Sequence, residues 1–86
     1  MKEFRYVIQD PLGIHARPAG LLVKAAKEFA DTEITISKGD KTVKASQLMK
    51  LMGLAVKQGD EVVVAANGPQ EDAAIAAAEA FLKENL

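Results

Sequence analysis

At residues 13–19 the chain reads Gly-Ile-His-Ala-Arg-Pro-Ala, and here a strand pattern gives way to a helix pattern. Pro18 suits the first turn of a helix, because the backbone N–H that proline lacks would have no partner there. Apolar residues then recur at positions 18, 22, 25 and 29, with a second row at 21, 25 and 26. This spacing predicts an amphipathic helix from about Ala16 to Phe29.

His15 is the only histidine of the chain, and the pattern places it at or just before the N-cap of this helix. Unpaired backbone N–H groups and the positive end of the helix dipole meet there. Imidazole is nucleophilic only when neutral, and the helix terminus disfavours the imidazolium form. A phosphoryl group on the ring would be stabilised by the backbone of the Ala16, Arg17 and Pro18 region and by the Arg17 guanidinium. The simpler alternative is a capping or surface histidine with Arg17 in solvent.

The other patterns predict the element order β-α-β-β-α-β-α. Alternating residues indicate strands at 2–8 and 33–37, and a Gly-containing hairpin loop at 38–41 leads into a strand at 42–45. Gly13 would let the backbone approach closely beside His15. Ser46 is a natural N-cap for a short helix at 47–52, and the continuous apolar run at 61–66 is typical of a central strand. Pro69 opens a helix with apolar residues at 74, 75, 78, 81 and 82.

These elements predict an α+β fold, a two-layer open-faced β-sandwich with a four-stranded antiparallel sheet and three helices on one face. With 86 residues, one domain spanning residues 1–86 is expected. The net charge of −1 argues against nucleic acid as a partner, and the absence of cysteine excludes disulfides and thiolate metal sites. We expect no metal and no cofactor, because one histidine gives a zinc site too few ligands. Without a signal-peptide pattern or a long apolar run, we expect a soluble cytoplasmic monomer with no membrane insertion.

The 13–19 string, placed directly after a short strand, resembles the phosphorylation-site motif of HPr, the histidine-containing phosphocarrier family of the bacterial phosphoenolpyruvate:sugar phosphotransferase system. The resemblance covers nearly the whole chain, including residues 39–43, 48–54 and 58–60. It implies the open-faced sandwich of that family, with the first and last strands central. It also implies that His15 takes a phosphoryl group at Nδ1 from phosphorylated enzyme I, with Arg17 stabilising the phosphate, and passes it to enzyme IIA. Such a protein is a phosphoryl carrier with a phosphohistidine intermediate rather than a free-standing enzyme.

The short helix carries apolar residues that predict a docking surface, namely Leu48, Met49 and Met52, since methionine repacks easily against different partners. The resemblance implies that this helix and the first helix meet enzyme I and enzyme IIA, and Gly20 would permit a close approach. The alternative is that the helix buries one side against the sheet and exposes only Met49 or Met52.

Many Gram-positive relatives carry a regulatory serine at the start of the short helix, phosphorylated by HPr kinase/phosphorylase. Matching Leu48 and Met49 to the family pattern puts Gln47, not Ser46, in the serine position, as if the preceding hairpin held one extra residue. Phosphorylation of Ser46 is therefore an open hypothesis, although a phosphate at a helix N-terminus is electrostatically tolerated.

Two other functions stay open at this point. One is a non-catalytic small α+β binding or pH-sensing module, in which His15 carries no covalent chemistry. The other is an HPr-like regulatory paralogue that acts in signalling rather than in sugar transport. A metal-dependent hydrolase is the weakest alternative, because the chain lacks ligands for it.

Overall fold

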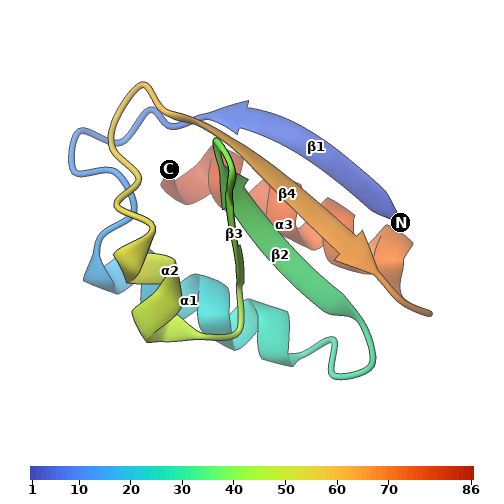
Figure 1. Cartoon of the computed structure of the whole chain (residues 1–86). Coiled ribbons are helices and arrows are strands. Elements are labelled where there is room, and N and C mark those ends of the chain that lie inside the picture. Colours follow the sequence, from blue (N-terminus) through green and yellow to red (C-terminus); the bar gives the residue numbers. More distant parts are fainter.

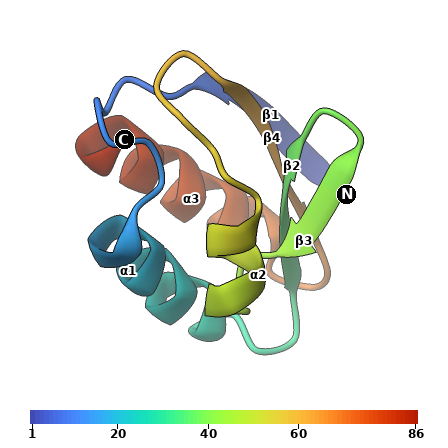
Figure 2. The ribbon, with the colours of Figure 1, turned by 60° about the vertical axis from the view of Figure 1, so that its left-hand side comes forward.

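A sheet and a layer of helices make up the structure, a computed structural model that describes residues 1–86 (Figure 1). The strands are β1 (Lys2–Val7), β2 (Glu33–Lys38), β3 (Lys41–Lys44) and β4 (Glu61–Asn67). The helices are α1 (Ala16–Lys27), α2 (Leu48–Gly53) and α3 (Glu71–Asn85). All of the helices lie on one side of the sheet, which is clearest in the turned view of Figure 2. The predicted fold class and element order are confirmed.

The sheet is antiparallel throughout, and the strands follow the order β1-β4-β2-β3. β4 is central as predicted, because Val64 lies opposite Phe4 of β1 on one side and Ile36 of β2 on the other. The expectation that the first strand is also central is wrong. β2 uses its second edge to pair with its hairpin partner β3, so β1 has only β4 as a neighbour and lies at the edge.

The hydrophobic core lies between the sheet and the helices. In β4 the buried residues alternate, with Val62, Val64 and Ala66 buried and Val63 and Ala65 half-buried. The continuous apolar run at 61–66 therefore has one fully buried face, since no helix covers the other side of the sheet. The helices complete the core mostly with small residues, which let them lie close to the sheet: Ala19, Leu22, Ala26, Leu51, Ala74, Ala78 and Leu82.

α1 differs from its predicted form in two respects. It ends at Lys27, because the amides of Glu28 and Phe29 turn to the carbonyls three residues back, both at 3.2 Å, and tighten the last turn. Leu21, which belonged to the predicted buried stripe, is 45% exposed, whereas Ala19 is fully buried.

Ser46 is not the N-cap of α2. It lies in a turn closed by a hydrogen bond from the Gln47 amide to the Lys44 carbonyl (3.1 Å), so the chain is not yet helical at Ser46. Gln47 takes the N-cap position, and its carbonyl accepts from the amide of Leu51 (2.9 Å). In the same way Gln70 is the N-cap of α3, so Pro69 precedes that helix instead of opening it.

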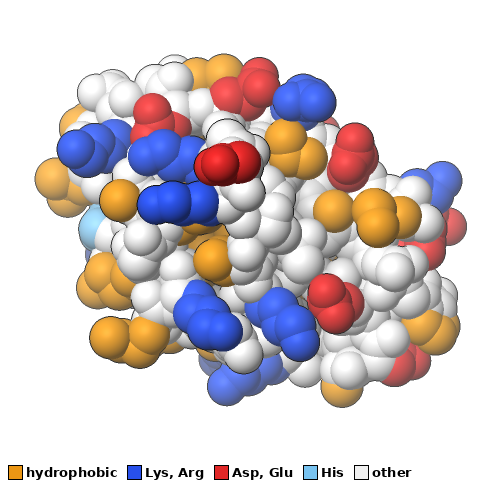
Figure 3. Space-filling view, in the orientation of Figure 1, with side chains coloured by type: hydrophobic (Ala, Val, Ile, Leu, Met, Phe, Trp, Pro, Cys, Tyr) orange, Lys and Arg blue, Asp and Glu red, His pale blue; other side chains and the backbone are white.

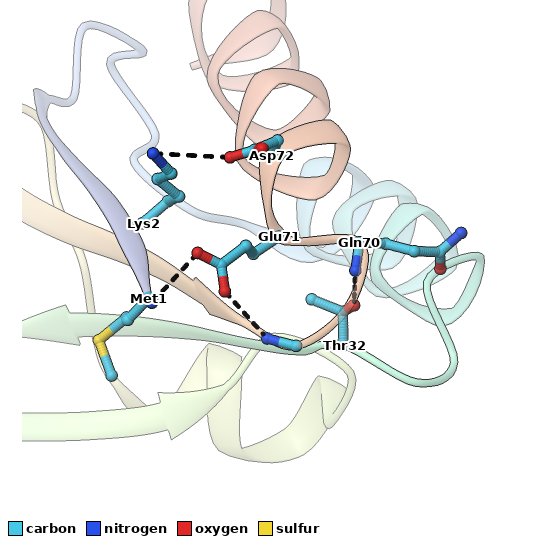
Figure 4. Close-up of polar contacts among 7 residues, drawn as sticks. Met1, Lys2, Thr32, Gln70, Glu71 and Asp72 are labelled. Atoms are coloured by element: carbon cyan, nitrogen blue, oxygen red, sulfur yellow. Dashed lines mark hydrogen bonds and ion pairs between the residues drawn. The ribbon is translucent and has the colours of Figure 1, made fainter.

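The start of α3 is held by polar contacts from distant parts of the chain (Figure 4). Thr32, the only buried polar residue, accepts a hydrogen bond at Oγ1 from the amide of Gln70 (2.9 Å). Glu71 lies 3.1 Å from the N-terminal ammonium of Met1, and this contact holds the pKa of Glu71 below its usual range. Glu71 and Asp72, both in the first turn of α3, also suit the positive end of the helix dipole.

A polar tether joins β2 to the loop before β4. The ammonium of Lys38 donates to the carbonyl of Ala55 (2.8 Å) and lies 3.0 Å from Oδ2 of Asp60. The same carboxylate accepts a hydrogen bond from the amide of Lys57 (2.9 Å). The pKa of Asp60 lies below its usual range, mainly because of the hydrogen bond from the Lys57 amide and next because of the Lys38 ammonium. The tether therefore fixes residues 55–60 relative to the sheet.

We expect Asp60→Asn to lower the melting temperature at neutral pH. We also expect the melting temperature of the variant to fall less steeply than that of the parent as the pH is lowered. Because the folded state lowers the pKa of Asp60, its ionised carboxylate contributes stability above the unfolded pKa and loses it as pH falls through the folded pKa. Thermal unfolding followed by circular dichroism should show the difference between variant and parent shrinking below about pH 4. Asp40→Asn, in the exposed hairpin turn, is the matched control, and identical pH profiles for Asp60→Asn and the parent would contradict the tether.

Candidate functional site

His15 is the N-cap of α1, as the sequence predicts. Its backbone is extended, with φ −105° and ψ −177°, and its carbonyl accepts a hydrogen bond from the amide of Ala19 (3.0 Å). The imidazole makes no capping bond, so it is not used to satisfy the helix end. The amides of Ala16 and Arg17 donate no hydrogen bond within the chain, which is the ordinary state of a first helical turn. The ring thus belongs to a helix end with free donors.

The His15 side chain lines a depression of about 300 Å³. This side chain is 35% exposed. The residues lining this depression come from three segments: Asp10, His15, Arg17, Pro18, Leu21, Glu84 and Asn85. His15 and Arg17 therefore lie together, as their spacing suggests. Glu84 and Asn85 have no sequence signal, since they reach the depression only because the end of α3 packs beside the start of α1 (Figure 2).

Asp10 brings a carboxylate to the imidazole, a contact that the sequence does not predict, because an aspartate followed by a proline is typical of a turn. Its Oδ2 atom lies 3.8 Å from Nε2 of His15. Its Oδ1 atom accepts a hydrogen bond from the amide of Leu12 (2.8 Å), and its backbone amide donates to the backbone oxygen of Leu86 (2.8 Å). Asp10 is therefore held from both sides while one oxygen stays directed at His15.

The loop before His15 rests directly on the segment before β4. The Ile14 amide donates to the carbonyl of Val56 (3.1 Å), and Gly13 adopts a positive φ of 65°. A Cβ atom at Gly13 would lie 2.2 Å from that same carbonyl oxygen, a distance that no side chain tolerates. The predicted close backbone approach at Gly13 is confirmed, and the partner is Val56.

We expect Gly13→Ala to destabilise the protein by about 2–4 kcal/mol, because alanine is disfavoured at this φ and its Cβ would overlap the Val56 carbonyl. Gly20→Ala is the matched control. No atom lies within 4 Å of the Cβ position at Gly20, which is inside α1, so this change should stabilise by about 0.5–1 kcal/mol. Urea unfolding measures both, and equal effects of the two changes would contradict the tight contact at Gly13.

α2 exposes three apolar side chains. Leu48, Met49 and Met52 are 40%, 82% and 39% exposed, while Leu51 is fully buried and anchors the helix. The alternative in which only Met49 or Met52 is exposed is wrong, because Leu51 is the one residue of α2 that is buried. Hydrophobic side chains gather near the histidine on the same side of the molecule (Figure 3). Gly20 has open space beside it and Leu21 lines the depression, so α1 adds to this apolar surface.

Ser46 and Gln47 lie away from the histidine, in a larger groove of about 740 Å³ at the other end of α1. Ala26 and Lys27 line it, which puts it roughly 18 Å along the 12-residue helix from His15. Ser46 is half-buried and lies one residue before the N-cap. Its phosphorylation stays an open hypothesis.

Neither metal ligands nor a membrane-spanning element is found. The structure brings no three His, Cys, Asp or Glu side chains together in a way that could bind a metal ion. Each helix is too short or too polar to cross a bilayer.

Comparison with known proteins gives one consistent result. A family model described as "PTS HPr component phosphorylation site" matches residues 2–84. The Phosphocarrier protein HPr of Mycoplasma genitalium is 35% identical over 85 residues, which covers 99% of this chain and 97% of the relative. That of Lysinibacillus sphaericus is 39% identical over 84 residues, covering 98% and 94%. The crystal structure of HPr-C-His from Thermoanaerobacter tengcongensis matches with a TM-score of 0.92 at 38% identity, covering 98% of this chain and 93% of that one.

Proposed function

This chain belongs to the HPr family of phosphocarrier proteins of the phosphotransferase system, and from this premise we propose that His15 accepts a phosphoryl group from phosphorylated enzyme I and passes it to enzyme IIA proteins for phosphoenolpyruvate-dependent sugar uptake. The observation that carries the proposal is the sole histidine at a helix N-terminus, half-exposed in a depression that Arg17 also lines. The chain would act in the cytoplasm as a single domain over residues 1–86, as a monomer and without a cofactor.

The chemistry begins with the lone pair on Nδ1 of a neutral His15, which attacks phosphorus in line with the bond to the donor nitrogen. That bond breaks, and its electron pair stays with the donor. Charge in the transition state lies on the three equatorial phosphoryl oxygens, where the Arg17 guanidinium and the free amides of Ala16 and Arg17 can pair with it. Pro18 has no backbone N–H, so it cannot donate a hydrogen bond to the phosphoryl group as Ala16 and Arg17 can.

An open site suits a carrier better than a closed one. The carrier must hold the phosphoryl group long enough to diffuse, yet release it to the next protein with little loss of free energy. Half-exposed His15 and exposed Arg17 leave room for the partner to complete the site with its own groups. The isolated chain is therefore a carrier rather than a free-standing enzyme.

Docking of these partners is assigned to the apolar side chains of Leu48, Met49 and Met52 on α2, with Gly20 on α1 beside them. The support is the exposure of these three side chains on a helix that contacts α1, because an exposed apolar patch on a small domain tends to mark a contact surface. Methionine adapts to several partners, which a carrier between two protein classes requires.

Phosphorylation of the chain tests the proposal directly. Incubation with enzyme I, magnesium and phosphoenolpyruvate should add one acid-labile phosphoryl group, seen by intact mass and by phosphorus NMR. His15→Ala should lose it, while its unchanged circular dichroism shows that the fold survives. A parent chain that takes no label under these conditions would support the binding or pH-sensing alternative instead.

We expect Arg17→Ala to slow phosphoryl transfer by about ten- to a thousandfold, because one donor to the transition-state charge is lost. The melting temperature should stay within about 4 °C of the parent, since Arg17 is exposed and makes no ion pair in the folded chain. Rapid-quench kinetics with enzyme I measures the rate. Lys24→Ala, an exposed cation further along α1, is the control, and equal rates for Arg17→Ala and the parent would remove Arg17 from the mechanism.

A further inference from the structure

The carboxylate of Asp10 is built into the site with two distinct tasks. Oδ1 accepts the Leu12 amide at 2.8 Å, and the Asp10 carbonyl accepts the Gly13 amide at 2.9 Å, so the residue closes its own turn. Its backbone amide is bonded to Leu86 at the end of α3. With the residue fixed in this way, Oδ2 takes no part in the turn, and it lies 3.8 Å from Nε2 of His15.

The distance of 3.8 Å between Oδ2 and Nε2 is longer than a hydrogen bond and too short for a water between the two atoms. A small rotation of the His15 side chain closes the gap, and bonds of this kind are often long in a free protein and tighten when the partner binds. Both side chains are largely covered, with 35% and 25% exposed, so solvent screens the pair only in part.

We infer that Asp10 is a positioning residue for His15: its Oδ2 atom keeps the imidazole proton on Nε2, which leaves the Nδ1 lone pair free to accept the phosphoryl group. The inference rests on the proposed function. An ionised carboxylate only accepts hydrogen bonds, so the ring nitrogen that faces it is the one that carries N–H. The same logic orients histidines that act as nucleophiles, bases or metal ligands elsewhere.

Asp10 also aids the onward step. When Nδ1 bonds to phosphorus with the proton retained on Nε2, the ring becomes a cation, which the Asp10 carboxylate stabilises. On transfer to the next protein the Nδ1–P bond breaks, its electron pair returns to Nδ1, and neutral imidazole leaves with the proton still on Nε2. Had that proton been lost, the leaving group would be the imidazolate anion, which departs far more slowly.

Other charged groups at the depression do not replace Asp10. The Arg17 cation from α1 opposes a positive ring, so it makes a facing carboxylate more necessary. Glu84 from α3 lines the same depression, yet its carboxylate is not within 4 Å of a His15 ring nitrogen. The backbone oxygen of Leu86 already accepts the amides of Gln9 and Asp10.

Asp10→Asn is the sharpest test, because its amide oxygen can still accept the Leu12 amide while the charge is gone. Onward transfer from the phosphorylated chain to enzyme IIA is measured from about pH 5.5 to about pH 8.5. We expect Asp10→Asn to be about three- to tenfold slower than the parent at the alkaline end and to match it at the acid end, where the ring holds its proton unaided. Asp31→Asn, which removes the same charge at the far end of α1, should follow the parent throughout.

Nitrogen-15 NMR of the unphosphorylated chain gives a second readout that needs no enzyme I. The parent should carry its proton on Nε2, and Asp10→Asn should show a mixture of the two tautomers. Equal tautomer populations and parallel pH profiles in the parent and Asp10→Asn would overturn the inference. It would also be overturned if Glu84→Gln, and not Asp10→Asn, slowed transfer at alkaline pH. Failure of enzyme I to label the parent would instead refute the proposed function, and the tautomer result would still decide the role of Asp10.

Discussion

The contact between the backbone at Gly13–Ile14 and the carbonyl of Val56 is the constraint on which the candidate site depends. The Ile14 amide bonds to that carbonyl, and Gly13 passes so close to it that no side chain fits between. Val56 is itself held in place, because Lys38 donates to the carbonyl of the preceding residue. The position of His15 at the N-cap of α1 is thus linked to the sheet by a side-chain hydrogen bond from Lys38 and a backbone hydrogen bond from Ile14.

A second support comes from the opposite side. The backbone oxygen of Leu86, at the end of α3, accepts the amides of Gln9 and Asp10, and its side chain is buried. The loop that carries Asp10 therefore lies between the segment before β4 and the end of α3. Both supports are backbone hydrogen bonds, which fix a loop more rigidly than exposed ion pairs between long side chains do. The imidazole stays half-exposed although its loop is firmly held.

The sequence predicts those features whose signals are local. The periodicity of apolar residues predicts the alternation of the strands. The backbone preferences of Pro18 and Gly13 predict the start of α1 and the close backbone approach before it. Features that depend on distant pairing were missed: β1 lies at the edge because β2 has its own hairpin partner. Serine favours the N-cap position, so the sequence predicts Ser46 as the cap of the short helix, whereas the turn after β3 moves the N-cap by one residue to Gln47. The carboxylate of Asp10 near His15 follows from a side-chain rotation that no spacing rule encodes.

The hydrogen bonds from the amides of Gln9 and Asp10 to Leu86 join two segments that lie far apart in the sequence. Contacts of such large sequence separation form late, since the chain entropy of closing the longest loop must be overcome first. During synthesis the loop before His15 has no final support until the last turn of α3 has left the ribosome. A chain in which α3 has not yet formed would therefore lack one of the two backbone supports that hold Asp10 beside His15.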